Sequence, residues 1–337
     1  MPRPGPAAGS ACARRGPYSI RLNPRVAGRA AGVCGVRHGK RGSGKDCPVR
    51  GGLGAGWAKM WTQDEREVNL CMEATVRGVR LAYEDVGQGA PVVFVHAFPL
   101  HKAMWRRQVE AVAAAGWRAI AVDLRGFGQS ELGREPFTMD GSADDVTALL
   151  DQLGIREPVV LVGLSMGGYV AFGCVRRHSQ RLRALVLADT RAEPDTDEAR
   201  AGRLETARRV EAEGVGPVVE SMLPRLVGAT THRERPAVVA EVRAMMEAAR
   251  PEGVAAALRG LAARPDSRPD LSRIAVPALV VVGQEDAITP PADAEALHGA
   301  IKDSRLAVIP GAGHLPNMET PEAFNAALLD FLGGLRG

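Results

Sequence analysis

The sequence predicts an α/β protein with a mostly parallel sheet flanked by helices and with an inserted helical cap. From residue 72 onward, short apolar runs recur along the chain, and segments with helical periodicity separate them. The runs show no polar alternation, which is typical of strands buried on both faces of a parallel sheet. One stretch, residues 191–270, offers helical patterns only and interrupts the alternation. We therefore expect this stretch to form the cap.

The predicted elements can be placed in chain order. An opening hairpin over residues 73–76 and 79–86 turns at Gly78. Six further strands are short apolar runs that end at a loop: residues 91–96, 118–123, 158–163, 183–189, 277–283 and 305–309. Core helices are expected over residues 103–115, 144–153 and 167–178, between the last two strands, and from Pro321 through Leu332 with Thr320 as the cap. Within the cap, helical patterns cover residues 198–213, 236–249 and 253–262.

The chain divides into three predicted parts. Residues 72–190 and 271–337 form the α/β core, and residues 191–270 form the cap. Residues 1–71 are rich in Gly and Pro and show no strand or helix periodicity, so we expect a disordered basic extension. Their composition also suggests an over-extended gene start, with Met72 or Met60 as the true first residue.

Charge and cysteine content restrict the partners and the compartment. Residues 1–71 carry 13 Lys and Arg against 4 Asp and Glu, whereas the rest carries 30 against 35, so a nucleic-acid partner is not expected. No apolar run reaches the roughly 18 residues of a membrane-spanning helix, and no membrane partner is expected. Cys174 is the single cysteine after residue 71, which suits a reducing cytoplasm. No zinc-type cluster of Cys and His is present, so neither a metal nor a cofactor is expected.

The pattern G-x-S-x-G occurs at Gly163-Leu164-Ser165-Met166-Gly167. It follows a predicted strand and precedes a predicted helix, which is the setting of a nucleophile elbow. In that turn the glycines allow close packing, and the serine hydroxyl projects into solvent. The alternative is an ordinary strand–helix turn with a capping serine. We interpret Ser165 as a nucleophile.

A serine hydroxyl needs a histidine to take its proton and an acid to orient that histidine. Of seven histidines, His314 lies in a Gly-rich loop directly after the last predicted strand. Asp286 follows the preceding strand, and Asp189 ends an earlier one, so both reach the same carboxyl edge of the sheet. We favour Asp286 as the acid and keep Asp189 as its competitor. The catalytic set is then Ser165, Asp286 and His314.

The order Ser165, Asp286, His314 is that of α/β-hydrolases. Residues 72–337 resemble that superfamily, and within it an esterase and lactonase branch with enzymes similar to 3-oxoadipate enol-lactonase and acyl-carrier methyl ester esterases. Two further segments carry the resemblance: 96–99 (His-Ala-Phe-Pro) is similar to the family's His-Gly-x-Pro loop, and 123–130 is similar to its D-x-R-G-x-G-x-S signature. The resemblance implies an α/β-hydrolase fold.

The resemblance also implies that the backbone N–H groups of Phe98 and Met166 form an oxyanion hole. Ala97 departs from the glycine that is commoner in the family loop, and its methyl group narrows the space beside Phe98. Three residues of the two segments are interpreted as structural residues that tie loops together: His96, Asp123 and Arg125.

Serine at the elbow restricts the reaction. Haloalkane dehalogenases and epoxide hydrolases need a carboxylate at this position, so acyl transfer to water is favoured. The expected function is a serine hydrolase that cleaves a small to medium carboxylic ester or lactone through an acyl-enzyme. Residues 191–270 contain no Phe, Tyr or Trp, which favours an aliphatic acyl group. The alternatives are a C–C bond hydrolase or perhydrolase with the same triad, and a hydrolase-fold ligand sensor with slight turnover.

Overall fold

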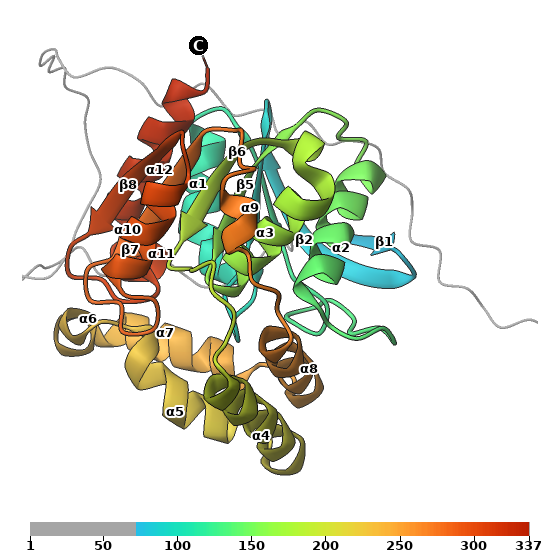
Figure 1. Cartoon of the computed structure of the whole chain (residues 1–337), viewed down its shortest axis with the longest axis vertical. Coiled ribbons are helices and arrows are strands. Elements are labelled where there is room, and N and C mark those ends of the chain that lie inside the picture. The colour runs from blue at the N-terminus through green and yellow to red at the C-terminus, as the bar shows by residue number, and fades with distance from the viewer. Residues whose placement is uncertain (1–71, 337) are drawn as a thin grey trace, which may run out of the picture. The chain divides into compact units, whose positions relative to one another are not determined.

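The computed structural model of the protein describes residues 72–336, which form an eight-stranded sheet with helices around it (Figure 1). The strands are β1 (Met72–Val76), β2 (Val79–Gly87), β3 (Pro91–Val95), β4 (Arg118–Val122), β5 (Val159–Leu164), β6 (Leu182–Ala188), β7 (Ala278–Gly283) and β8 (Ser304–Ile309). Their order in the sheet is β1-β2-β4-β3-β5-β6-β7-β8. Strand β2 is antiparallel to both β1 and β4, and the strands from β4 to β8 are parallel. The predicted α/β class is confirmed.

Strand character follows from side chains that are buried on both faces. Every residue of β3, β5 and β7 is buried, as the unbroken apolar runs predict for central parallel strands. The opening hairpin turns through Arg77 and Gly78, whose φ angles are 47° and 75°. Both angles lie in the left-handed region that a tight two-residue hairpin turn requires, which Gly78 adopts without strain.

The core helices are η1 (Lys102–Trp105), α1 (Arg106–Ala114), α2 (Met139–Gln152), α3 (Met166–His178), η2 (Ser179–Arg181), α10 (Pro291–Ala300), α11 (Pro316–Glu319) and α12 (Pro321–Gly334). Helix α2 begins at Met139, five residues before the predicted start. The hydroxyl of Thr138 accepts a hydrogen bond from the N–H of Gly141 at 2.9 Å and caps this earlier turn. Thr320 is the N-cap residue of α12 and Pro321 follows at its first position, as predicted, but the Thr320 side chain makes no capping bond, because its hydroxyl donates to the carbonyl of Pro316.

Between β6 and β7 the chain is helical. The helices are α4 (Asp197–Glu213), α5 (Gly216–Leu226), α6 (Ala229–Glu234), α7 (Pro236–Glu247), α8 (Pro251–Ala262) and α9 (Arg268–Leu271). In Figure 1, α4 to α8 gather below the sheet and its flanking helices. Helices α5 and α6 were not among the predicted elements, because Pro224 interrupts the first and the second is short and polar. We keep the word cap for residues 191–270.

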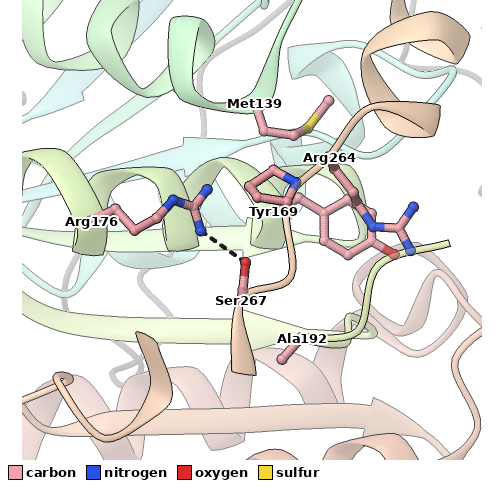
Figure 2. Close-up of a pocket in the computed structure, with 7 residues that line it drawn as sticks. Met139, Tyr169, Arg176, Ala192, Arg264 and Ser267 are labelled. Carbon is pink, nitrogen blue, oxygen red and sulfur yellow. Dashed lines mark hydrogen bonds between the residues drawn. The ribbon is translucent and has the colours of Figure 1, made fainter. Parts of the chain in front are cut away.

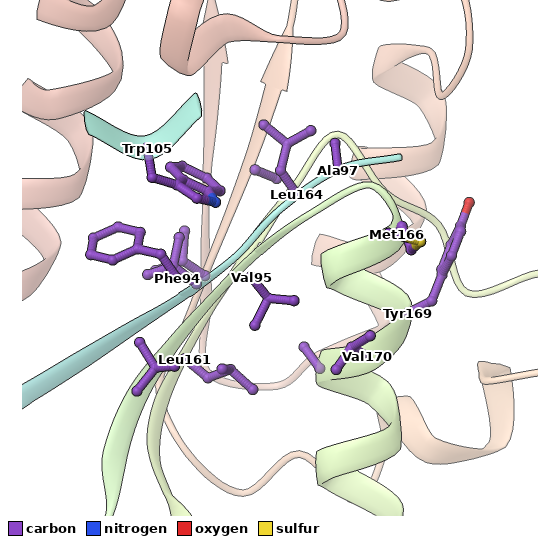
Figure 3. Close-up of a cluster of buried hydrophobic side chains, with 14 of the residues drawn as sticks. Phe94, Val95, Ala97, Trp105, Leu161, Leu164, Met166, Tyr169 and Val170 are labelled. Atoms are coloured by element: carbon purple, nitrogen blue, oxygen red, sulfur yellow. The ribbon is translucent and has the colours of Figure 1, made fainter. Parts of the chain in front are cut away.

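A dense apolar cluster supports the turn between β5 and α3 (Figure 3). Phe94 and Trp105 pack with ring centroids 5.2 Å apart, and both side chains are fully buried. Leu164 and Met166, on either side of Ser165, are also fully buried. Tight packing of this kind resists displacement, so the turn rests on a rigid base.

The expected disorder of residues 1–71 lies outside the described residues. None of the helices in residues 72–336 is long and apolar enough to cross a membrane.

Candidate active site

Ser165 sits at the sharp turn between β5 and α3 with φ 54° and ψ −110°. A positive φ is strained for a residue with a side chain, so the surroundings must hold it there. The N–H of Ser165 donates to the carbonyl of Ala188 at 2.9 Å, and the hydroxyl of Thr190 donates to the carbonyl of Ser165 at 3.0 Å. Ser165 is partly exposed between two buried neighbours. The turn thus leaves Ser165 partly accessible.

The glycines of the motif are required by close approach of backbones. A Cβ atom on Gly167 would lie 2.2 Å from the carbonyl oxygen of Val95 on β3. A Cβ on Gly163 would lie 2.2 Å from the carbonyl oxygen of Gly167. Real Cβ atoms do not make contacts this short, so larger residues would force the turn apart.

The carboxyl ends of four neighbouring strands bring the other polar residues to the same edge. Ser165 follows β5, Asp189 follows β6, Asp286 follows β7 and His314 follows β8, and these strands are adjacent in the sheet. His314 and Asp286 are directly bonded: Nδ1 of His314 lies 2.7 Å from Oδ2 of Asp286. Donation from Nδ1 leaves Nε2 as the basic nitrogen of the neutral ring. Among the described residues, no hydrogen bond joins the Ser165 hydroxyl to His314.

Asp286 is held as an anion. Its Oδ1 accepts from the N–H groups of Ile288 at 2.7 Å and Thr289 at 3.1 Å, and its Oδ2 accepts from the Thr289 hydroxyl at 2.7 Å. Burial raises the pKa of Asp286, but His314 and these donors outweigh the burial and hold the pKa below its usual range. Asp286 therefore provides a negative charge beside His314.

Asp189 occupies the same edge in a different state. Its backbone has φ 43°, its Oδ1 accepts from the N–H of Gly283 at 2.8 Å, and its Oδ2 is buried without a hydrogen-bond donor from residues 72–336. Burial, followed by the negative charge of Asp286, raises the pKa of Asp189 well above its usual range. The residue that the sequence offered as the alternative acid contacts Gly283, while Nδ1 of His314 bonds to Asp286.

Asp189, Asp286 and His314 also form the one group in the described part of the chain with metal-like spacing, their ligand atoms lying within 4.8 Å of one another. The direct bond of 2.7 Å between His314 and Asp286 does not suit a shared ion. Two ligands of a tetrahedral zinc, each about 2.0–2.1 Å from it, lie roughly 3.3 Å apart. These residues therefore fit a hydrogen-bonded pair better than a metal site.

Phe98 and Met166 lie on the two segments that flank Ser165. Met166 begins α3, whose first N–H groups have no partner within the helix and carry the positive end of its dipole. Phe98 is buried, and its bond to Pro99 is cis. Neither backbone N–H donates to a residue in the range 72–336. Both groups are thus available to an acceptor from a ligand.

Three residues of the loops after β3 and β4 make contacts that fix these loops. Nε2 of His96 accepts from the N–H of Leu124 at 3.0 Å, and burial lowers the pKa of His96 to about 4, so this ring is neutral. Asp123 accepts from the N–H and the ammonium of Lys102, each at 2.7 Å. Arg125 pairs with Asp145. The first two sets of contacts join the loops after β3 and β4, and the last joins the loop after β4 to α2.

Two acids near the loops of Asp286 and His314 were not identified from the sequence as site residues. Glu285, beside Asp286, bonds to Thr230 of the cap. Glu319 of α11 accepts from the N–H groups of Gly313 and Leu315, on either side of His314. Nothing in the local sequence marks Glu319, because its partners are backbone groups that only the fold brings to it.

A cavity of about 360 Å³ lies between the cap and the core. Ile288, whose N–H donates to Asp286, is the core residue of its lining, and Arg191 lies at the start of the cap, directly after Thr190. On the cap side its lining mixes apolar and basic side chains, among them Val218, Met222, Leu258, Arg203 and Arg225. The cavity therefore adjoins the loop that carries Asp286.

The residues that line a second, smaller pocket bond to one another across it (Figure 2). Arg176 of α3 donates to the Ser267 hydroxyl at 2.9 Å and to Asp270 at 2.7 Å. The guanidinium of Arg264 lies 4.5 Å from the ring centroid of Tyr169. Both cations are thus used to hold the segment after α8 against α3.

Comparisons with known proteins agree with the fold. A family model described as alpha/beta hydrolase fold matches residues 90–321. A 3-oxoadipate enol-lactonase from Acinetobacter baylyi is 30% identical over 256 residues, which cover 75% of this chain and 93% of that protein. A thermophilic esterase from Thermogutta terrifontis is 45% identical with a TM-score of 0.77, over 79% of this chain and 99% of that one. A bromoperoxidase from Bacillus anthracis is 28% identical with a TM-score of 0.69, over 78% and 99%.

Proposed function

The chain belongs to the α/β-hydrolase fold family, in its esterase and lactonase branch, and on that premise we propose that it is a serine hydrolase. Its substrate would be a small to medium carboxylic ester or lactone, cleaved through an acyl-enzyme. The observation that carries the proposal is the bond of 2.7 Å between His314 and Asp286, at the sheet edge where Ser165 sits in a strained turn.

In the proposed reaction, Oγ of Ser165 attacks the substrate carbonyl carbon while Nε2 of His314 takes the hydroxyl proton. The oxyanion that forms accepts hydrogen bonds from the N–H groups of Phe98 and Met166. His314 then gives its proton to the departing alcohol oxygen, and the ester C–O bond breaks. Water attacks the acyl-enzyme by the same route and releases the acid and free Ser165.

Asp286 supports this proton transfer through its charge. An ionised carboxylate at Nδ1 stabilises the imidazolium that forms on His314 and selects the tautomer with a basic Nε2. The lowered pKa of Asp286 keeps this carboxylate ionised at neutral pH.

The cavity that adjoins the loop of Asp286 supports the size of substrate that we propose. Its volume of about 360 Å³ is at the small end of the range for small-molecule sites. Val218, Met222 and Leu258 offer an aliphatic surface for an acyl chain. Methionine adapts to irregular shapes, which suits a range of acyl groups.

Hydrolysis of 4-nitrophenyl acetate and butyrate, together with labelling by a fluorophosphonate probe, tests this proposal. We expect turnover of both esters and a covalent adduct on Ser165 by mass spectrometry, both lost in Ser165→Ala. Labelling without turnover would indicate a ligand sensor. Labelling of a different serine would contradict the assignment.

Perhydrolysis is a second candidate, because a structural relative is a bromoperoxidase. Hydrogen peroxide would replace water in the second half-reaction, giving a peracid and free Ser165. Peracetic acid formed from acetate and hydrogen peroxide, measured beside ester hydrolysis, distinguishes the two. Hydrolysis of a C–C bond by the same triad is a further alternative. Cleavage of a β-diketone would indicate it.

The cytoplasm and small-molecule partners are also part of the proposal. Cys174 is a free cysteine buried in α3, and burial raises its pKa to about 12, so its thiol is unreactive. The acidic balance after residue 71 gives no support for a nucleic-acid partner.

A further inference from the structure

Three segments from distant parts of the chain meet behind His314. They are the loop after β7, the loop after β8 and the cap segment 227–230 between α5 and α6. A Cβ on Gly313 would lie 2.3 Å from the backbone nitrogen of Gly228, and a Cβ on Gly228 would lie 2.8 Å from that of Gly313. The cap backbone and the histidine loop therefore touch directly.

One buried carboxylate bonds to both partners of this contact. Glu319 is 2% exposed, and its Oε1 accepts from the N–H of Gly313 at 2.9 Å and of Leu315 at 3.0 Å. Its Oε2 accepts from the N–H of Gly228 at 2.8 Å. The first oxygen holds the peptide groups on both sides of His314, and the second holds the cap. Charge-assisted bonds of this kind are stronger than neutral ones.

Glu285 makes a similar connection between the cap and the loop of Asp286. Glu285 precedes Asp286, and its two oxygens accept from the N–H of Thr230 at 2.8 Å and from the Thr230 hydroxyl at 2.5 Å. The N–H of Glu285 donates to the carbonyl of Ala312 at 2.8 Å, which joins the two triad loops to each other. The same cap segment is thus bonded to the loops of both Asp286 and His314.

We propose that Glu319 is a positioning residue that couples the cap to the catalytic histidine. This inference rests on the proposed function. Glu319 sets the direction of His314 through the two flanking peptides and transmits the position of the cap to the same loop. A displacement of the cap at Gly228 would then move His314 away from Ser165, so the cap and the proton acceptor act as one unit.

The two oxygens of Glu319 have different partners, and this allows the two links to be cut separately. In Glu319→Gln the amide oxygen keeps Gly313 and Leu315, while the amide nitrogen faces the N–H of Gly228 as donor against donor. This variant cuts the cap link. Glu319→Ala removes both links. Glu322→Gln is the matched control, since it removes the same charge from an exposed position three residues away.

We expect Glu319→Ala to lower kcat on both 4-nitrophenyl acetate and butyrate by roughly 100-fold, the effect of a small misplacement of a catalytic group. Glu319→Gln should raise KM for butyrate more than for acetate, with a smaller loss of kcat. The reason is that the cap, which lines the cavity, loses its bond from Gly228 to Glu319. Amide hydrogen exchange should quicken at residues 227–230 in both variants, and at residues 313–315 in Glu319→Ala only. The control should match the wild type in all three measurements.

A folded Glu319→Ala protein with kcat within threefold of the wild type would overturn the proposal, as would equal exchange at residues 313–315 in the two Glu319 variants. If Glu319→Ala does not fold, Glu319→Gln decides: unchanged KM and unchanged exchange at residues 227–230 refute the coupling. Should the wild type show neither ester turnover nor fluorophosphonate labelling, the proposed function fails. The exchange comparison between the Glu319 variants still tests the link itself in that case.

Discussion

Replacing Asp189 with asparagine should stabilise the protein, and more so at higher pH. Asp189 is buried and its pKa is raised well above the usual range, first by burial and then by the nearby charge of Asp286. The folded protein therefore holds a proton on Asp189 that the unfolded chain releases near pH 4. Asparagine keeps the shape of the side chain, and its oxygen can accept from the N–H of Gly283. Its N–H group replaces Oδ2 of Asp189, which has no hydrogen-bond partner among the described residues, and can donate to Asp286.

The size of the effect follows from the number of protons bound. Above the unfolded pKa of about 3.9, the folded wild type binds one proton more than the unfolded chain at this site, so its free energy of unfolding falls by about 1.4 kcal/mol per pH unit. The fall continues until the pH reaches the folded pKa of Asp189. Asparagine has no proton to release, so the advantage of Asp189→Asn grows with the same slope. Its upper limit between pH 4 and pH 7 is about 4 kcal/mol.

Urea unfolding of the wild type and Asp189→Asn at pH 4, 5, 6 and 7 measures this difference directly. The two proteins should have similar stabilities near pH 4 and diverge above it. Asp303→Asn, which changes an exposed acid, is the control and should show no such divergence. A difference in unfolding free energy that stays constant from pH 4 to pH 7 would show that Asp189 is ionised in the folded protein and would refute the reasoning.

Three further predictions concern the elbow and the triad. Ser165→Ala should lower ester turnover by roughly 10⁴-fold or more, and adding His314→Ala should cost little extra because the two act as a unit; a residual rate within tenfold of the wild type contradicts the assignment. Asp286→Asn should lower kcat strongly without unfolding the protein, measured beside Asp189→Asn; if Asp189→Asn is the inactive one, the acid belongs to β6. Gly167→Ala should lower the melting temperature sharply, because the new Cβ would lie 2.2 Å from the carbonyl oxygen of Val95; an unchanged melting temperature would show that the turn can relax.

The parts of the fold that were predictable are those in which local pattern and burial agree. Strands β3, β5 and β7 are apolar throughout and buried throughout, so their runs marked them to within a residue or two. The predicted start of helix α2 was five residues too late, because the Thr138 hydroxyl accepts from the N–H of Gly141 and caps an earlier turn. Helix α5 was missed because Pro224 reads as a break, although packing of its apolar face keeps the helix together.

The candidate site divides in the same way. Ser165, Asp286 and His314 could be placed together because each follows a strand, and the carboxyl ends of parallel strands meet at one edge. Glu319 could not be identified, because the cap residue that it bonds, Gly228, is 91 residues away and offers only a backbone N–H. Contacts to backbone groups leave no mark on residue type, so they become visible only in the folded chain.

The two aspartates at this edge show what decides the state of a buried acid. Both are almost fully buried, and both lie beside the same triad loops. Asp286 receives bonds from Ile288, from Thr289 twice and from His314, and its pKa is lowered; Asp189 receives one, from Gly283, and its pKa is raised. Burial raises the pKa of both acids, so the charge of His314 and then the hydrogen-bond donors to Asp286 make the difference. The negative charge on Asp286 in turn favours the proton on Asp189, and one edge of the sheet thereby holds a charged acid for His314 next to a neutral one.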